Sequence, residues 1–347
     1  KGFKRLAVAQ GGHKLAVSAT PFGKGGRVQG MFGTLHWLWP DEFTSFWRWA
    51  DRYFEIDEQY ISRRVGSVKK IVGLASGQNE EEFLRSLGPR IMRRTKEEVL
   101  PNLPPKQYVE VLCEMAASQA RQYAQLSEIN TPGGMVVAIG VLAEITRAKQ
   151  VANGTINVVD SGAVAFTGDS GKIEALWDKL EARGILTGDG DTKVIVASQF
   201  NEFLDVVAAK LRDAGVAYHL LTGKTSDSKR DAAMDQFQGD GGPRVFLLNA
   251  KAGGVSITLD AADEVHCLDE LWNPEDQEQL EDRAHRASRI HQVTIFHYRS
   301  EGTIDENIAE DVEAKRFDQH KVLDGRRGLA YARELIRTRA TVKENAA

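Results

Sequence analysis

Residues 193–221 read KVIVASQFNEFLDVVAAKLRDAGVAYHLL, and they set the pattern of the second half of the chain. An apolar run begins at Val194. It is followed by a segment whose apolar residues recur every three or four positions and which ends at Gly215, before the apolar run VAYHLL. A strand that is apolar on every residue is buried on both faces, and an amphipathic segment between two such strands is typical of a crossover helix. Asn201 is the expected N-cap of that helix.

The same alternation continues along the chain on both sides of this stretch. Continuous apolar strands that alternate with amphipathic helices predict an α/β fold, with a RecA-like or doubly wound parallel sheet covered by helices on both faces. Further strands are expected in RVFLLN (244–249), EVHCLD (264–269) and QVTIFHYR (292–299), and further helices after Gly171, over about 227–238 and from about Thr303.

The first half of the chain is harder to assign. HKLAVSATPF (13–22) is predicted to be a buried parallel strand followed by a tight turn, and KQYVEVLCEM (106–115) has the alternation of a strand. Residues 31–54 favour a packed helical hairpin over a base-stacking surface. Residues 152–171 form a loop or a hairpin. Two basic clusters lie beside an otherwise helical pattern, where a solvated face and a phosphate-tracking surface remain open: Arg63, Arg64, Lys69 and Lys70, then Arg90, Arg93, Arg94 and Lys96.

Composition and charge exclude several classes of protein. The 347 residues carry a formal net charge of −4, yet residues 1–110 hold 18 Lys and Arg against 12 Asp and Glu. Cys113 and Cys267 lie in apolar runs, which favours reduced, buried thiols. No apolar run of membrane-spanning length and no export leader is present, so we expect no membrane partner. The chain lacks an initiator Met, and its first residues, KGFKRLAVAQ, resemble the inside of a domain, which favours a fragment.

The stretch LDELWNPEDQEQLEDRAHRASR (268–289) predicts a helix that carries two arginines to a phosphate. Asn273 is a good N-cap and Pro274 suits the first helical position. Gln279, Arg283 and Arg286 are spaced by four and three residues, so one helical face would carry all three. The alternative is a solvated helix in which Glu281 pairs with His285 and Asp282 with Arg286.

Several motifs point to chemistry that their context does not support. Gly223, Lys224 and Thr225 spell the end of a P-loop, but the glycine that the motif needs upstream is absent, which favours a turn. The loop GKGGRVQG (23–30) also lacks the P-loop spacing. Asp269 and Glu270 imitate a magnesium-holding acidic pair, but no P-loop strand precedes them. The eight histidines show no metal-ligand spacing, so no metal site within the chain is predicted.

Six segments of the chain are, in order, KLAVSATPF, KVIVASQF, HLLTGKTSDSKRDAAMDQF, FLLNAKAGGVSITLDAADEV, LWNPEDQEQLEDRAHR and YRSEGTIDENI. Together they resemble the later helicase motifs of the Swi/Snf-type ATPases, the DNA-translocating branch of helicase superfamily two. An earlier segment, FLRSLGPRIMRRTKEEVLPNLPPK, resembles the stretch after that family's first helical insertion. The chain departs from the family at Ala250–Gly254 and at Ser288 and Arg289, and the family's P-loop and Asp-Glu box would precede residue 1.

The resemblance implies a division of the chain into parts of two RecA-like lobes with helical insertions. The implied parts are the end of the first lobe (1–22), a first helical insertion (23–105), the last strand of the first lobe with a link (106–115), a second helical insertion (116–168), the second lobe (169–300), and a C-terminal bracing helix and tail (301–347).

The resemblance also implies a function, the C-terminal part of an ATP-dependent double-stranded-DNA translocase or helicase. The partners would be DNA, through its phosphate backbone, and the missing N-terminal lobe, which would hold most of the Mg²⁺. Arg283, Arg286 and Gln279 would be catalytic. ATP would contact Gly253, Gly254 and Asp260 as well as the two arginines. The DNA-binding residues would be Ser18, Thr20, Ser198, Gln199, Phe200, Thr222, Gly223, Lys224, Thr225, Asn249 and Lys251.

Without the first lobe, this chain alone is expected to be inactive as an ATPase. Two alternatives stay open: a non-catalytic DNA- or partner-binding module on the same scaffold, and the motor part of a restriction or strand-annealing enzyme. The expected location is the cytoplasm, of a prokaryotic or virus-infected cell, or the nucleus if the source is eukaryotic.

Overall fold

The computed structural model describes residues 13–18, 21–22, 27–62, 66–127, 135–158, 164–251 and 257–324. The chain divides into two compact units. The first unit contains residues 1–95, 272–275 and 311–347, and the second contains residues 96–271 and 276–310. Each unit is described below by itself.

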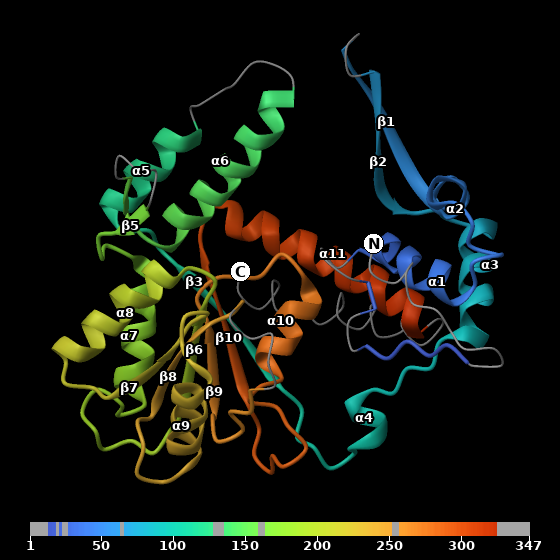
Figure 1. Ribbon diagram of the computed structural model, residues 1–347. Coiled ribbons are helices and arrows are strands. Elements are labelled where there is room, and N and C mark those ends of the chain that lie inside the picture. The colour runs from blue at the N-terminus through green and yellow to red at the C-terminus, as the bar shows by residue number, and fades with distance from the viewer. Residues whose placement is uncertain are drawn as a thin grey trace, which may run out of the picture. The chain divides into compact units, whose positions relative to one another are not determined.

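The second unit is built on a six-stranded sheet (Figure 1) in the order β3-β10-β9-β6-β8-β7. Every neighbouring pair in this sheet is parallel. Parallel neighbours require crossover connections, and the intervening helices supply them. This confirms the predicted RecA-like α/β class. The strands are β3 (Gln107–Cys113), β6 (Val194–Ser198), β7 (Tyr218–Leu221), β8 (Val245–Asn249), β9 (Glu264–Cys267) and β10 (Thr294–Ser300).

Alternate residues of the central strands enter two separate cores. Val194 and Val196 of β6 belong to one apolar cluster with side chains of α7 (Gly171–Ala182) and α8 (Asn201–Asp213). Ile195 and Ala197 belong to a second cluster, with Phe237 of α9 (Asp227–Gln238) and Leu280 of α10 (Pro274–Glu281). Successive side chains of a strand point to opposite faces, so the two clusters lie on the two sides of the sheet. The sheet is therefore covered by helices on both faces.

The remaining elements of the second unit lie around this sandwich. A short antiparallel hairpin joins β4 (Ile156–Val158) and β5 (Val164–Phe166), which agrees with the expected loop or hairpin over 152–171. Gly184 and Gly215 follow α7 and α8 with φ of +64° and +72°, a conformation that favours glycine. The other helices are α4 (Lys96–Val99), α5 (Ala117–Ser127), α6 (Met135–Asn153) and α11 (Ile304–Asp324). No helix in the described part of the chain is long and apolar enough to cross a bilayer.

The first unit packs around aromatic side chains. Trp49 and Phe83 are buried with their ring centroids 5.8 Å apart, edge to face. The aromatic stretch 31–54 therefore supplies core, as predicted, although Trp47 is 44% exposed. The elements are η2 (Val28–Met31), α1 (Phe32–Leu38), α2 (Phe46–Tyr53), β1 (Phe54–Ser62), β2 (Gly66–Leu74), α3 (Gln78–Leu87), η3 (Gly88–Arg90) and the part of α11 from residue 311.

Three expectations for the first half of the chain are wrong. Residues 13–18 are not a strand, and Leu15 and Val17 are 80% and 87% exposed. An apolar run becomes a buried strand only where neighbouring strands accept its backbone groups, and none of the described strands does so here. The region expected to be a helical insertion contains the β1–β2 hairpin. Finally, β3 pairs along its whole length with β10, so it belongs to the second-unit sheet and not to an end of a first lobe.

Candidate functional site

The arginine-bearing segment is a helix followed by a turn. Asn273 accepts the backbone N–H of Glu275 at 3.1 Å, and Pro274 opens α10, so the start of the helix is as predicted. The helix ends at Glu281, however, and residues 282–289, here called the arginine turn, continue without helical structure. The expected helical face shared by Gln279, Arg283 and Arg286 is therefore wrong. Gln279 lies exposed on α10.

The helix stops because other segments take its backbone groups and its side chains. The carbonyl of Arg283 accepts the N–H of Leu259 at 2.9 Å, so it is not available to continue the helix. Lys106 contacts the carboxylates of both Glu281 and Asp282, at 3.1 and 2.9 Å. The alternative, a solvated helix through these residues, is wrong as well, because the helix ends at Glu281 and Glu281 is fully buried.

The two arginines of this turn lie near each other. Arg283 is buried, and Arg286 is half-buried and donates to the carbonyl of Ile257 at 3.3 Å. Burial lowers the pKa of Arg283, and the positive charge of Arg286 lowers it further. A bound anion would offset both effects, because opposite charge favours the ionised guanidinium. The residues present thus fit a phosphate group.

The other predicted nucleotide contacts are only partly described. Asp260 lies beside the arginine turn, where its carboxylate accepts hydrogen bonds from Ser288 and Gln238 and its carbonyl accepts one from Arg289 at 2.8 Å. Burial alone would raise the pKa of Asp260, but these hydrogen bonds outweigh it and lower the pKa. Gly253 and Gly254 lie outside the described residues.

The predicted DNA-facing residues at the end of β6 are organised by Asp269. The carboxylate of Asp269 accepts the backbone N–H of Gln199 at 3.1 Å, the side-chain amide of Gln199 at 2.8 Å and the hydroxyl of Ser198. Ser198 is fully buried, and Phe200 packs against the α7–α8 core. In the sequence, Asp269 resembles an acidic metal ligand. In the structure, its carboxylate instead accepts hydrogen bonds that hold the end of β6.

The loops after β8 and β7 reach the same edge of the sheet. Asn249 donates to the carbonyl of Gln199 at 3.1 Å and to Asn201 at 2.7 Å. The N-cap of α8 is therefore Phe200 and not Asn201, and the side chain of Phe200 makes no capping hydrogen bond. The exposed Lys251 follows Asn249 and donates its N–H to it at 2.9 Å. Since β7 runs parallel to β8, its C-terminal loop extends the same edge.

The turn after β7 contains Gly223, Lys224 and Thr225, as the sequence favoured. Thr222 and Thr225 close it, with the N–H of Thr222 donating to the hydroxyl of Thr225 at 3.0 Å and the N–H of Thr225 donating to the carbonyl of Thr222 at 3.0 Å. Gly223 and Lys224 are exposed. Ser18 is exposed in the first unit, and Thr20 lies outside the described residues.

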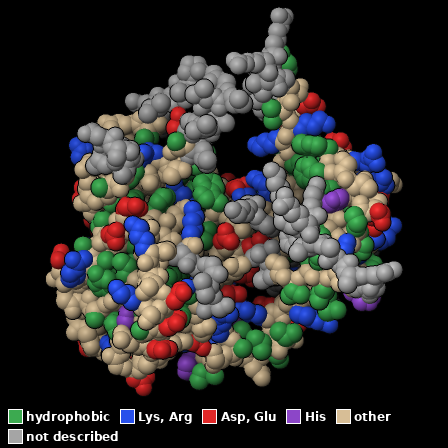
Figure 2. Space-filling model, in the orientation of Figure 1, with side chains coloured by type: hydrophobic (Ala, Val, Ile, Leu, Met, Phe, Trp, Pro, Cys, Tyr) green, Lys and Arg blue, Asp and Glu red, His purple; other side chains and the backbone are tan. Residues whose placement is uncertain are grey.

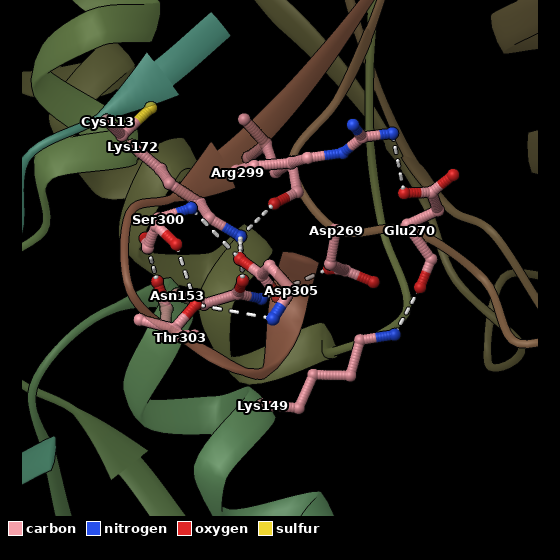
Figure 3. Close-up of polar contacts among 12 residues, drawn as sticks. Cys113, Lys149, Asn153, Lys172, Asp269, Glu270, Arg299, Ser300, Thr303 and Asp305 are labelled. Atoms are coloured by element: carbon pink, nitrogen blue, oxygen red, sulfur yellow. Dashed lines mark hydrogen bonds and ion pairs between the residues drawn. The ribbon is translucent and has the colours of Figure 1, made fainter. Parts of the chain in front are cut away.

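A buried polar network, which sequence reasoning missed, supports this edge from inside (Figure 3). Lys172 of α7 is fully buried and donates to Asp305 at 2.6 Å, to Asn153 at 2.8 Å and to the carbonyl of Leu268 at 2.9 Å. Asn153 in turn donates to Asp269 at 3.1 Å. The network therefore connects α6, α7 and α11 to the segment that follows β9.

Lys149 of α6 belongs to the same region. Its ammonium group donates to the carbonyl of Glu270, and burial lowers its pKa from 10.5 to about 8. Glu270 itself accepts Arg299 at 3.1 Å. Oxygen atoms of Asp269 and Glu270 thus accept hydrogen bonds from side chains of the protein. Among the described residues, no group of three or more His, Cys, Asp or Glu side chains could hold a metal ion.

Charge is mixed on the visible surface. Figure 2 shows Lys and Arg side chains interspersed with Asp and Glu over the drawn face of the second unit. Exposed Lys224 and Lys251 lie on the two loops just described. A nucleic-acid contact here would therefore depend on these two lysines and not on a broad basic surface.

Comparison with known proteins agrees with this architecture. The model of the SNF2-related domain matches residues 3–161, and that of the helicase conserved C-terminal domain matches residues 171–288. A solved structure titled "Crystal structure of the C-terminal part of Fun30 ATPase domain" covers 60% of this chain with 90% of its own, at a TM-score of 0.51 and 22% identity, which supports the fold.

The chain is also similar to curated proteins from mouse and human. The chain is 27% identical to the mouse SWI/SNF-related matrix-associated actin-dependent regulator of chromatin subfamily A member 1, over 90% of this chain and 29% of the relative. It is 28% identical to human chromodomain-helicase-DNA-binding protein 1, over 92% of this chain and 18% of the relative. The chain thus spans less than a third of the length of either relative.

The parallel sheet with helices on both faces is the fold that this chain shares with that solved structure. The two matched models lie one after the other and cover most of the chain. The predicted resemblance to the Swi/Snf-type ATPases is confirmed, since a match to the SNF2-related domain is followed by a match to the helicase conserved C-terminal domain.

Proposed function

We propose that this chain is the C-terminal part of an ATP-dependent double-stranded-DNA translocase. Its second unit is the lobe that supplies arginines to ATP, and a P-loop lobe outside the chain holds the nucleotide and most of the Mg²⁺. The observation that carries this proposal is that one short turn holds the buried Arg283 and the half-buried Arg286, and that burial first, then the positive charge of Arg286, lowers the pKa of Arg283. The matches to the SNF2-related domain and to the helicase conserved C-terminal domain support it.

The chemistry required of these arginines is charge neutralisation. During phosphoryl transfer, negative charge spreads over the phosphate oxygens, and an arginine from a facing lobe accelerates the reaction about a thousandfold or more. The fixed fork of a guanidinium suits two phosphate oxygens. In this chain, Arg286 would contact the phosphates. The more deeply buried Arg283 would add a second positive charge that helps to neutralise the same phosphates. Mg²⁺ would supply further neutralisation when bound.

The DNA contact in this proposal lies at the strand-end loops. The loops are residues 198–200, 222–225 and 249–251, and their exposed lysines, Lys224 and Lys251, bind phosphate oxygens without reading bases, which suits a motor that ignores sequence. The arginine turn and these loops extend from the same sheet. Closing the nucleotide site would therefore move the DNA-binding loops with the lobe.

The test uses the complete protein that carries this chain. DNA-stimulated ATP hydrolysis is measured for the unchanged protein, for Arg286→Ala and for Arg212→Ala, a matched loss of an exposed arginine on α8. We expect Arg286→Ala to lower kcat at least about a hundredfold and Arg212→Ala to have no effect. Equal activity of all three proteins would overturn the proposal. So would ATPase activity in residues 1–347 alone that Arg286→Ala abolishes.

A further inference from the structure

The arginine turn is held on one side by a segment that lies far from it in sequence. Residues 96–108, here called the strap, run from α4 into β3 and contact both flanks of Arg283. On the N-terminal flank, the buried carboxylate of Glu281 accepts Lys106 at 3.1 Å and the hydroxyl of Tyr108 at 3.0 Å. His297 lies 3.4 Å from the same carboxylate. Glu281 is thus surrounded by strap and sheet donors.

The strap also holds the residues adjacent to Arg283. Asp282 lies 2.7 Å from Lys96 and 2.9 Å from Lys106. On the C-terminal flank, the carbonyl of His285 accepts Lys96 at 2.8 Å, and the ring of His285 lies 2.7 Å from the carbonyl of Pro104. Lys96 therefore bridges the two sides of Arg283 by itself.

The opposite side of the turn is fixed by a different segment, residues 257–263. Besides the contacts of Arg283 with Leu259 and of Arg286 with Ile257, Arg289 forms an ion pair with Asp263 at 2.6 Å. The turn is therefore clamped between the strap and this loop. A shift of either one would move the two guanidiniums.

The composition of the strap contact indicates more than packing. Burying ion pairs is costly, and apolar residues of similar volume often stabilise a fold as well or better. Burial alone would lower the pKa of Lys106, but Glu281 first, then Tyr108 and Asp282, outweigh it and raise the pKa. The lysine is thus held charged and in a defined direction. Catalytic groups need such fixed placement, because a displacement of about 1 Å costs about a hundredfold in rate.

We propose that the strap positions the arginine pair for ATP, and that Lys96 and Lys106 are its positioning residues, acting through Asp282, His285 and Glu281. This inference rests on the proposed function, because it gives the arginines their role from there. It adds that the connection entering β3 takes part in setting the rate of hydrolysis.

The main test is a kinetic comparison in the complete protein. Lys96 is chosen because its side chain is 34% exposed, so its replacement leaves less buried charge unpaired than that of Lys106. Lys96→Met should lower kcat about tenfold and leave KM for ATP within about twofold, because the arginines act mainly in the transition state. Lys96→Arg should restore most of the rate. The control is Arg183→Met, which removes an ion pair to the buried Glu264 of β9, outside the strap, and should leave kcat unchanged.

A second measurement does not depend on activity. Hydrogen exchange of the amides of residues 282–289 is followed in the complete protein for Lys96→Met and for the charge-neutral double variant Lys106→Met with Glu281→Gln. We expect faster exchange in this turn in both variants, with unchanged exchange in β6 and β8. Arg183→Met should not affect the turn.

The outcomes separate the two proposals. If Arg286→Ala lowers kcat but Lys96→Met behaves like Arg183→Met, the strap inference is wrong and the proposed function stands. If Arg286→Ala has no effect, the proposed function fails, and with it the catalytic role given to the strap. Unchanged exchange of residues 282–289 in both strap variants would overturn the inference whatever the kinetics show.

Discussion

The backbone N–H of Gln199 donates to the carboxylate of Asp269 across a distance of 3.1 Å, so the residue after β6 is held by the second residue after β9. These strands are neighbours in the sheet, paired in parallel register. A carboxylate at the end of one strand can therefore fix the loop that leaves the next strand. Two adjacent strand ends become one rigid platform.

Asp269→Asn should destabilise the protein and loosen this platform. The amide would present N–H groups to donors, namely Ser198, Gln199 and Asn153, so at least one buried donor loses its acceptor. We expect a loss of about 2 to 4 kcal/mol in the free energy of unfolding, measured by urea denaturation. Asp191→Asn, whose side chain is fully exposed, should change it by less than about 0.5 kcal/mol. Equal effects would contradict the role given to Asp269.

The buried Lys149 should make stability depend on pH in a defined window. Its pKa is lowered by burial to about 8 in the folded protein, against 10.5 ordinarily. Between these values the unfolded chain binds more protons at this lysine, so the free energy of unfolding rises with pH. Lys149→Met lacks this contribution. The wild-type minus Lys149→Met difference in unfolding free energy should increase by about 2 kcal/mol between about pH 7.5 and about pH 9.5.

The difference between the two proteins is the quantity to measure in that experiment, because other groups titrate nearby in pH. Burial raises the pKa of Cys113 from 9.0 to about 11, which lowers stability as pH rises between those values. This contribution is present in both proteins and cancels. A difference that stays flat across the window would mean that Lys149 is not buried as described.

The exposed lysines of the strand-end loops should contribute to DNA affinity through phosphates alone. In the complete protein, Lys224→Ala and Lys251→Ala should each weaken binding equally for unrelated duplex sequences, and each should reduce the slope of log affinity against log salt by about 1. Fluorescence anisotropy at several salt concentrations measures this slope. Arg212→Ala serves as the control and should leave it unchanged. A sequence-dependent loss would argue against backbone recognition.

Two glycines that end helices should respond differently to the same change. Gly184 and Gly215 both have positive φ, but a Cβ on Gly184 would lie 2.7 Å from the backbone nitrogen of Gly190, whereas a Cβ on Gly215 meets nothing within 4 Å. Gly215→Ala should cost about 1 kcal/mol for its conformation, and Gly184→Ala at least about 1 kcal/mol more because of the clash. Urea denaturation of both variants tests the order, and equal losses would contradict it.

The centre of the sheet was predictable because β6 and β8 are apolar on almost every residue. A run such as VIVAS of β6 is apolar on both faces of the strand, so it can be buried only between two layers of helices. The alternation of strands with helices, and with it the fold class, therefore follows from local sequence. The helix predicted over about 227–238 agrees with α9. The start of α10 was predictable for the same local reason, since an Asn-Pro pair fixes a helix start without help from distant residues.

What could not be predicted depends on contacts between distant residues. The end of α10 is set by Lys106 and Leu259, and no spacing in the helix itself reveals them. Lys149 and Lys172 look like ordinary helical lysines, yet both are buried among partners from other elements. The run 13–18 shows the converse case, because its strand-like pattern has no neighbouring strand among the described residues to complete it.

The position of β10 has a consequence for the synthesis of this protein. β10 lies between β3 and β9 in the sheet, although β3 is made early and β10 near the end of the described chain. During synthesis on the ribosome, β3 therefore forms before β10, the one strand that pairs with it in the described part of the chain, and Tyr108 and Leu112 are among the exposed residues of β3. A nascent chain that pauses before residue 294 would present two unpaired strand edges, and it is at this stage that a chaperone would be needed most.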